Sequence, residues 1–325
     1  MKKHWMATIL FIVVLLLFVQ KELSLDVVPY IHDKDESAAP AASSPSSLFE
    51  QVEKAADSLN EPPVDAVVDK VWKAVPGYNG KMVDTKASYE KMKRDGSFDE
   101  RKLVFEEVSP EVHLEDLPPT PVYKGNAQKP MVSFLINVSW GEDYLPSILK
   151  TLREEKVKAT FFLEGRWVQK NPKLAKMIKE EGHEIGSHAY SHPDLSTSSR
   201  ARIKEELQKT NEALAAVLSV EPRLFAPPSG SFNQETVDIA HDMGMYTILW
   251  TVDTIDWKNP EPMDMAVKTA SKVENGSMIL MHPTASTAGG LKEMIRIIKE
   301  KNLQIDTVTH LLDETRMQTT SSSTN

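Results

Sequence analysis

Cysteine is absent from this chain, which excludes disulfide bonds and any metal site built on thiolates. A metal would have to be held by histidine, carboxylate and water ligands. Basic residues are in deficit, because 38 Lys and Arg stand against 47 Asp and Glu and leave a formal charge of −9. This balance argues against nucleic acid as a partner, since neutralising phosphates requires a basic face. The sequence also has no Gly-rich phosphate loop, which argues against nucleotide binding.

The N-terminus carries an apolar run, residues 6–19, directly after a short basic stretch. The run is shorter than the roughly 20 residues that a membrane-spanning helix needs, and it matches the core of an export signal. No small-x-small cleavage site follows it. Residues 1–22 are therefore predicted to export the chain to the cell-wall side of a membrane, and whether they remain as an anchor stays open. A buried N-terminal helix is the less favoured alternative.

Residues 23–47, rich in Ser, Ala and Pro, are predicted to be a disordered tether, because they cannot bury enough apolar surface to offset their ordering entropy. Residues 48–117 are predicted to form a small α+β unit of unknown role, in which the valines of 64–72 have helical spacing. A Pro-rich linker, 118–130, separates this unit from the main domain, 131–313. The last residues, 314–325, are predicted to be a disordered tail.

The main domain alternates between strand-like and helix-like segments. This alternation predicts a parallel sheet covered by helices, although periodicity alone cannot separate a closed barrel from an open doubly wound sheet. The predicted strands are 132–138, 159–163, 184–187, 224–226, 246–252, 277–281 and 304–308. Segments with helical periodicity include 172–181, 199–218, 235–243, 263–273 and 291–301.

Five short motifs lie at or just after the predicted strand ends, the edge where parallel α/β folds build their sites. They are 136–141 (INVSWG), 188–192 (HAYSH), 226–230 (APPSG), 253–257 (DTIDW) and 280–282 (LMH). In this order they resemble the polysaccharide deacetylases of the NodB-homology family, carbohydrate esterase family 4. That family removes acetyl groups from N-acetylglucosamine in chitin and peptidoglycan. The resemblance is greatest to the sporulation-type branch of Gram-positive bacteria, and it implies a distorted (β/α) barrel of seven to eight parallel strands.

His188 and His192 have a spacing that, on a helical turn, places both imidazoles on one face within reach of a single ion. Two polar loop histidines are the alternative. The resemblance implies a divalent metal, most often zinc, held by these two residues and an Asp of the first motif. That Asp position is Val138 here, so binding is expected to be weak. Glu142 and Asp143 remain open as substitute ligands, although they are more simply explained as opening the next helix.

The resemblance also assigns the general base of deacetylation to position 137, which is Asn137 in this chain. An amide can orient a water molecule but cannot accept its proton, and loss of a general base costs about 10²–10⁴-fold in rate. The Arg that holds the base in the family is replaced by Ala226. The two changes fit together, because a guanidinium beside a neutral amide would lack its partner.

The acid side of the motif set is complete. The resemblance makes His282 the general acid and Asp256 the carboxylate that orients it, with a structural histidine at a strand end as the alternative. Trp167 and Trp250 are assigned to the core. The candidates for substrate binding, with Tyr190 supplying an oxyanion amide and the others the acetyl pocket and groove, are Trp140, Tyr190, Pro228, Trp257 and Leu280.

Two classes of function remain open. The first is a cell-wall amidohydrolase that removes acetate from N-acetylglucosamine polymers, with low activity because of Asn137 and Ala226. The second is a catalytically inactive module that keeps the glycan groove and acts in binding or regulation. In both, the partner is a cell-wall glycan, and the membrane is contacted through residues 6–19.

Overall fold

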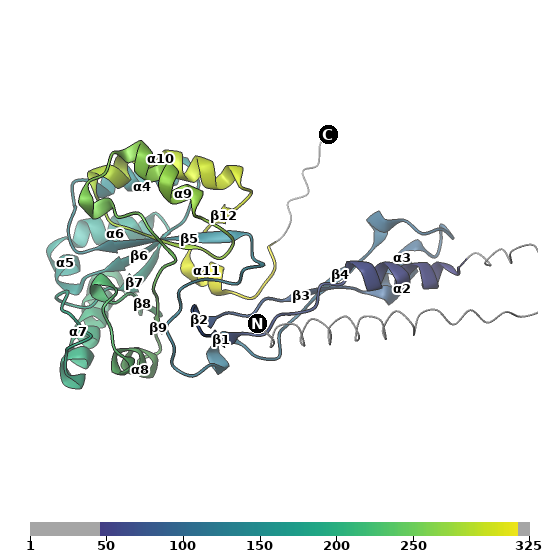
Figure 1. The fold of residues 1–325 in the computed structure, drawn as a ribbon, viewed down its shortest axis with the longest axis horizontal. Helices are drawn as coiled ribbons and strands as arrows, with labels where there is room; N and C mark the ends of the chain where they lie inside the picture. The colour runs from purple at the N-terminus through teal and green to yellow at the C-terminus, as the bar shows by residue number, and fades with distance from the viewer. Residues whose placement is uncertain (1–45, 318–325) are drawn as a thin grey trace, which may run out of the picture. The chain divides into compact units, whose positions relative to one another are not determined.

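The computed structural model describes residues 46–317 (Figure 1). The predicted export signal, 1–22, and the predicted tether up to residue 45 lie outside these residues and stay predictions. Within 46–317, no helix combines the length and the apolar character that crossing a membrane requires.

Helix α2, Leu48–Leu59, opens the described chain with a capping box. Ser47 Oγ accepts from Glu50 N, and the Glu50 carboxylate accepts from Ser47 N, so two orphan amides are satisfied. The helix packs on α3, Thr85–Met92, and both cover a small two-stranded sheet of β3, Gly80–Val83, and β4, Phe105–Val108. The apolar cluster between them contains Val52, Ala56, Val83, Met92 and Leu103.

The helix predicted over 64–72 is wrong: this stretch forms a β-hairpin instead. Strand β1, Val67–Asp69, pairs antiparallel with β2, Lys73–Val75. Asp69 stabilises the turn between the two strands, because its Oδ1 accepts from the amides of Val71 and Trp72, both at 2.7 Å. A short side chain that bonds nearby backbone amides favours a turn over a helix, and β-branched valines favour extended backbone.

Hydrogen bonds fix the segments on either side of the main domain. The predicted linker bonds to the main domain, and the residues that follow the domain bond to the 48–117 unit. Val122, in the predicted linker, is fully buried; its amide donates to Thr247 O and its carbonyl accepts from Leu249 N, both at 2.8 Å. At the other end, Glu314 bonds His113 at 2.7 Å, and Arg316 donates to Asn79 O at 3.1 Å. The predicted linker therefore contributes a strand-like segment, and the first residues of the predicted tail contact the 48–117 unit.

The main domain is a curled sheet of parallel strands, as the resemblance implies. Seven strands follow the order β10-β11-β5-β6-β7-β8-β9. Strand β12 pairs in parallel with the first two residues of β5. The central strand β5 is buried along its whole length. The bounds are β5 Met131–Val138, β6 Thr160–Leu163, β7 Glu184–Ser187, β8 Leu224–Phe225, β9 Tyr246–Thr247, β10 Val252–Asp253, β11 Met278–Met281 and β12 Gln304–Ile305.

The predicted strand 246–252 is two short strands, β9 and β10. Between them Ile248 makes a parallel bridge to Val122, so the N-terminal segment occupies the stretch where the sheet is distorted. The helices surround this sheet: α9 and α4 pack against α10, and α7 packs against α8 in another part of the barrel (Figure 1). Their bounds are α4 Leu145–Glu154, α5 Gly165–Lys170, α6 Pro172–Glu180, α7 Arg200–Leu218, α8 Gln234–Asp242, α9 Pro262–Ser271, α10 Ala285–Glu300 and α11 Val308–Leu312.

Candidate functional site

A pocket of about 420 Å³ lies at the carboxyl ends of the parallel strands. All five sequence motifs contribute lining residues to this pocket, although they are spread along the chain from β5 to β11. The predicted site residues that line it are Asn137, Trp140, His188, His192, Trp257, Leu280 and His282.

The two histidines of the second motif face each other in this pocket. Their ring centroids are 5.1 Å apart with an interplanar angle of 71°. His188 Nδ1 lies 2.8 Å from the carbonyl oxygen of Ala226. A carbonyl can only accept, so Nδ1 carries the proton and Nε2 keeps its lone pair. Burial lowers the pKa of His188 to about 3, which leaves the ring neutral and able to act as a ligand at pH 7.

The donor set around these rings fits a weakly held divalent cation. Within residues 46–317, no group of three or more His, Cys, Asp or Glu side chains could hold a metal. Asn137 Oδ1 is buried, and no described residue gives it a hydrogen bond. The two imidazoles would hold the ion, with water completing its shell and the unpartnered Asn137 oxygen available to accept from such a water. Val138, at the third ligand position of the family, is fully buried in the apolar core instead.

Glu142 does not serve as a substitute ligand. Its Oε1 accepts from Trp167 Nε1 at 2.9 Å and from Asn171 Nδ2 at 3.2 Å, so the carboxylate is committed to α5. Neither Glu142 nor Asp143 belongs to the described residues that line the pocket. The two residues precede α4, which begins at Leu145.

His282 and Asp256 form a histidine–aspartate pair at the site, in which the carboxylate is fully buried and the imidazole is partly exposed. Asp256 has no exposed surface, and its Oδ1 lies 2.8 Å from His282 Nδ1. Since a carboxylate only accepts, Nδ1 carries the proton and Nε2 is left to serve the pocket. Asp256 Oδ2 also accepts from His282 N at 2.6 Å and from Thr287 Oγ1 at 2.6 Å. Trp140 stacks on the other side of the imidazole, with centroids 6.1 Å apart and planes 8° apart.

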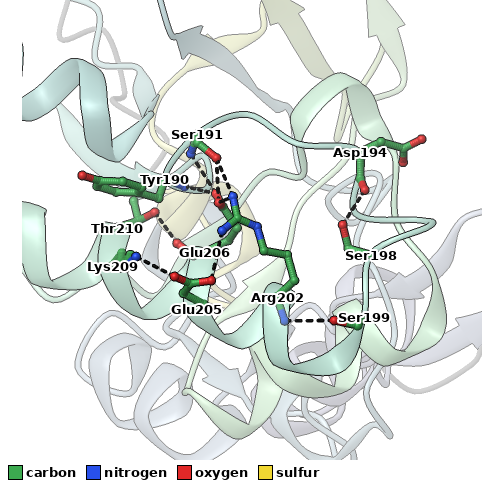
Figure 2. Close-up of polar contacts among 10 residues, drawn as sticks. All are labelled: Tyr190, Ser191, Asp194, Ser198, Ser199, Arg202, Glu205, Glu206, Lys209 and Thr210. Carbon is green, nitrogen blue, oxygen red and sulfur yellow. Dashed lines mark hydrogen bonds and ion pairs between the residues drawn. The ribbon is translucent and has the colours of Figure 1, made fainter.

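Two predicted substrate contacts are placed elsewhere. The amide of Tyr190 donates to Glu206 Oε2 at 2.8 Å, so it is not free to bind an oxyanion (Figure 2). Spacing between two histidines cannot reveal this, because the acceptor is on a helix that begins later in the chain. Pro228 is buried inside a 3-10 turn, and its neighbour Ser229 lines the pocket instead.

Sequence reasoning missed four lining residues. Trp250 packs against the core, as the sequence predicts, and it also reaches the pocket from the break between β9 and β10. Asp253 supplies the one carboxylate among the described lining residues, and its Oδ1 accepts from Ile255 N at 2.7 Å. Asp253 is the first residue of the fourth motif, so its sequence position could have identified it as a site residue. The missed residues are Ser139, Ser229, Trp250 and Asp253.

Gly141 allows the first and fifth motifs to approach each other. A Cβ at this position would lie 2.1 Å from Pro283 O, and φ is +87°, in the left-handed region. Gly141→Ala should therefore lower the free energy of unfolding by about 2–4 kcal/mol, combining overpacking with left-handed strain. Gly244→Ala is the matched control, because φ is +75° there but nothing lies within 4 Å. Equal urea midpoints for the two variants would contradict the Pro283 contact.

Comparison with known proteins gives a consistent result. A family model described as Polysaccharide deacetylase matches residues 124–248. The uncharacterized protein YlxY of Bacillus subtilis is 50% identical over 288 residues, covering 89% of this chain and 90% of that protein. The peptidoglycan-N-acetylglucosamine deacetylase PgdA of Listeria monocytogenes is 34% identical over 170 residues, covering 52% of this chain but only 36% of PgdA.

Among solved structures, wild-type BA3943 from Bacillus anthracis is described as a CE4 family pseudoenzyme. It matches with a TM-score of 0.77 and 50% identity, covering 84% of this chain and 97% of BA3943. A BA3943 mutant described as a pseudoenzyme with restored enzymatic activity matches with a TM-score of 0.78 and 49% identity, covering 84% of this chain and 100% of the mutant.

Proposed function

This chain belongs to the polysaccharide deacetylase family, and on that premise we propose that it binds N-acetylated cell-wall glycan of the peptidoglycan type and hydrolyses its acetyl groups only weakly. The observation that carries the proposal is Asn137. It lines the same pocket as the histidine pair and His282, at the family's base position, and an amide cannot accept a proton. The description of BA3943 as a pseudoenzyme supports the same reading.

The binding half of the proposal rests on the walls of the pocket. Trp140 and Trp257 are about half exposed at its mouth, where their faces can pack on sugar rings. Leu280 offers an apolar contact for an acetyl methyl group. Such a pocket, apolar with a few placed polar groups, is typical of a small-ligand site.

The catalytic half follows from the polar groups. A divalent cation such as zinc, when bound by His188 and His192, supplies Lewis-acid polarisation of the acetyl carbonyl and of a water molecule. Asn137 can orient that water through its amide but cannot take its proton. His282, held by Asp256 at Nδ1, donates a proton from Nε2 to the leaving amine when its ring carries protons on both nitrogens. The site has a proton donor for the leaving amine but no residue at position 137 that accepts the proton of the attacking water, so hydrolysis is slow.

A direct test compares binding with turnover in the purified chain. Calorimetric titration with N-acetylglucosamine oligomers should give binding, while acetate release with and without added zinc should be near the limit of detection. Rapid acetate release by the parent chain would overturn the weak-enzyme proposal and point to another base, with Asp253 as the first candidate. Absence of glycan binding would overturn the proposal as a whole.

Metal binding gives a separate prediction. Zinc should bind the parent chain with a dissociation constant weaker than about 1 μM, because two imidazoles completed only by water make a poor ligand set. Replacing both His188 and His192 by Ala should remove this binding in calorimetry. His241→Ala, on the outer helix α8, is the matched control and should leave it unchanged. Tight zinc binding that survives the double replacement would place the metal elsewhere.

For its location, we propose export with attachment at the outer face of the membrane through residues 6–19. The apolar run after a basic start supports this. A fusion of residues 1–45 to a reporter enzyme that is active only after export tests it, and a fusion that is produced but stays inactive would contradict it.

A further inference from the structure

Helix α7 buries a carboxylate beside the site but outside its pocket. Glu206 has no exposed surface, although α7 otherwise presents charged residues to solvent. A charge in such a place is costly unless several partners compensate it. The partners of Glu206 are almost all in the short loop that separates the two pocket histidines, residues 189–191 (Figure 2).

One oxygen of this carboxylate holds two successive backbone amides of the loop. Glu206 Oε2 accepts from Tyr190 N at 2.8 Å and from Ser191 N at 2.7 Å. The other oxygen, Oε1, accepts from Ser191 Oγ at 2.6 Å and pairs with Arg202 Nη2 at 2.5 Å. Arg202 Nη2 also donates to Ser191 Oγ at 3.1 Å, which closes a small polar ring around the loop. These charge-assisted bonds are stronger than neutral ones.

The opposite side of the loop is held by the first turn of α5. Gly165 N donates to Ala189 O at 2.9 Å, and Arg166 N donates to Tyr190 O at 3.0 Å. The loop backbone is therefore bonded from both sides, with its carbonyls on α5 and its amides on Glu206. Gly165 admits this approach, because a Cβ there would lie 2.5 Å from the Tyr190 ring.

The two histidines depend on this loop to different degrees. His188 N donates to Leu163 O at 3.0 Å, so the sheet itself sets its position. His192 follows the loop, and both Ala189 and His192 have left-handed backbone, with φ of 59° and 56°. Such conformations cost about 1–3 kcal/mol each in non-glycine residues and persist only where surrounding bonds enforce them. Between Ala189 and His192, the amides of Tyr190 and Ser191 donate to Glu206, and the Tyr190 carbonyl accepts from Arg166 N.

We infer that Glu206 is the positioning residue of the histidine pair: it holds the loop so that His192 converges on His188. The inference rests on the proposed function only for the identity of the ligand, since the loop geometry stands by itself. Its role is to fix the distance between two imidazoles, and it touches neither the glycan nor the ion. Removing an outer partner that orients a metal ligand typically weakens metal affinity by about 10–100-fold.

The test uses zinc alone and the full chain. Glu206→Ala should weaken zinc binding in calorimetry by about 10–100-fold. Glu206→Gln keeps an oxygen for the two amides but loses the charge that pairs with Arg202, so its loss should be smaller. Glu205→Ala is the matched control: it is next in sequence, it also pairs with Arg202, and it is exposed with no bond to the loop. Its zinc affinity should equal that of the parent.

Amide hydrogen exchange of segment 188–192 provides a readout without metal. Exchange should become faster in Glu206→Ala and stay unchanged in Glu205→Ala, both compared at equal fraction folded. Equal zinc affinity and equal exchange in these two variants would overturn the inference. If Glu206→Ala does not fold, Glu206→Gln compared with Glu205→Gln decides by the same two measurements. If the parent chain binds no zinc, the metal part of the proposed function fails, and exchange alone decides on Glu206.

Discussion

Asn137→Asp should raise acetate release from N-acetylglucosamine oligomers by about 100-fold or more, the factor that a general base supplies. The substitution changes one terminal group at nearly constant volume, so the packing around β5 should tolerate it. Asn137 already lines the pocket, and its buried Oδ1 has no hydrogen-bond partner among the described residues. A carboxylate at this place would face the water that a cation held by His188 and His192 activates.

Two further variants make this experiment decisive. Adding His282→Ala should remove the gained activity, because the leaving amine then lacks its acid. Adding Asp253→Asn should leave most of the gain, because the new base and not Asp253 is responsible. If Asn137→Asp binds glycan and zinc as the parent does yet releases no more acetate, a missing base is not what limits turnover.

Ala226→Arg should act differently alone and in combination. Ala226 is buried in an apolar cluster with Leu135 and Ile248, so an isolated guanidinium there should destabilise the chain. In the Asn137→Asp background the two new charges can pair, and part of that loss should be recovered together with a further gain in acetate release. A double-mutant cycle on urea midpoints measures the coupling.

Asp256→Ala should lower the free energy of unfolding by about 3–5 kcal/mol, the cost of removing one partner from a buried charged network. Its carboxylate accepts from His282 twice and from Thr287, with Thr284 Oγ1 at 3.4 Å, and truncation leaves these donors buried without an acceptor. Urea unfolding followed by Trp fluorescence measures the change.

Asp264→Ala is the control for this loss. Asp264 lies exposed in the first turn of α9, where removing a surface carboxylate should cost less than about 1 kcal/mol. A similar loss for both variants would mean that the buried network contributes little to stability.

Local sequence signals located most of the main-domain elements. The bounds of β7, 184–187, are the predicted ones, and α6 begins at Pro172 after Asn171 as its sequence indicates. The helix predicted over 199–218 begins at Arg200, and Ser199 is its N-cap rather than its first residue. These features depend on residues within one or two turns of each other, which is the range that a sequence pattern reports.

Two errors in the main domain arose where distant segments decide the local conformation. Strand 246–252 is split because Ile248 pairs with Val122, more than a hundred residues earlier in the chain. Motif order correctly brought Asn137, His188 and His282 into one pocket. It could not reveal that the Tyr190 amide is bonded to Glu206, because the acceptor of a backbone amide is a property of the folded chain.

The bridge made by Val122 has a consequence for the order of assembly during synthesis. Its hydrogen-bond partners, Thr247 and Leu249, leave the ribosome long after Val122 itself. Until then the N-terminal segment has no strand to join, and its apolar side chain stays open to solvent or to other chains. Contacts of such high sequence separation slow folding, since loop closure must precede the gain from pairing. Residues 247–249 therefore complete a pairing that the chain up to Val122 cannot make alone.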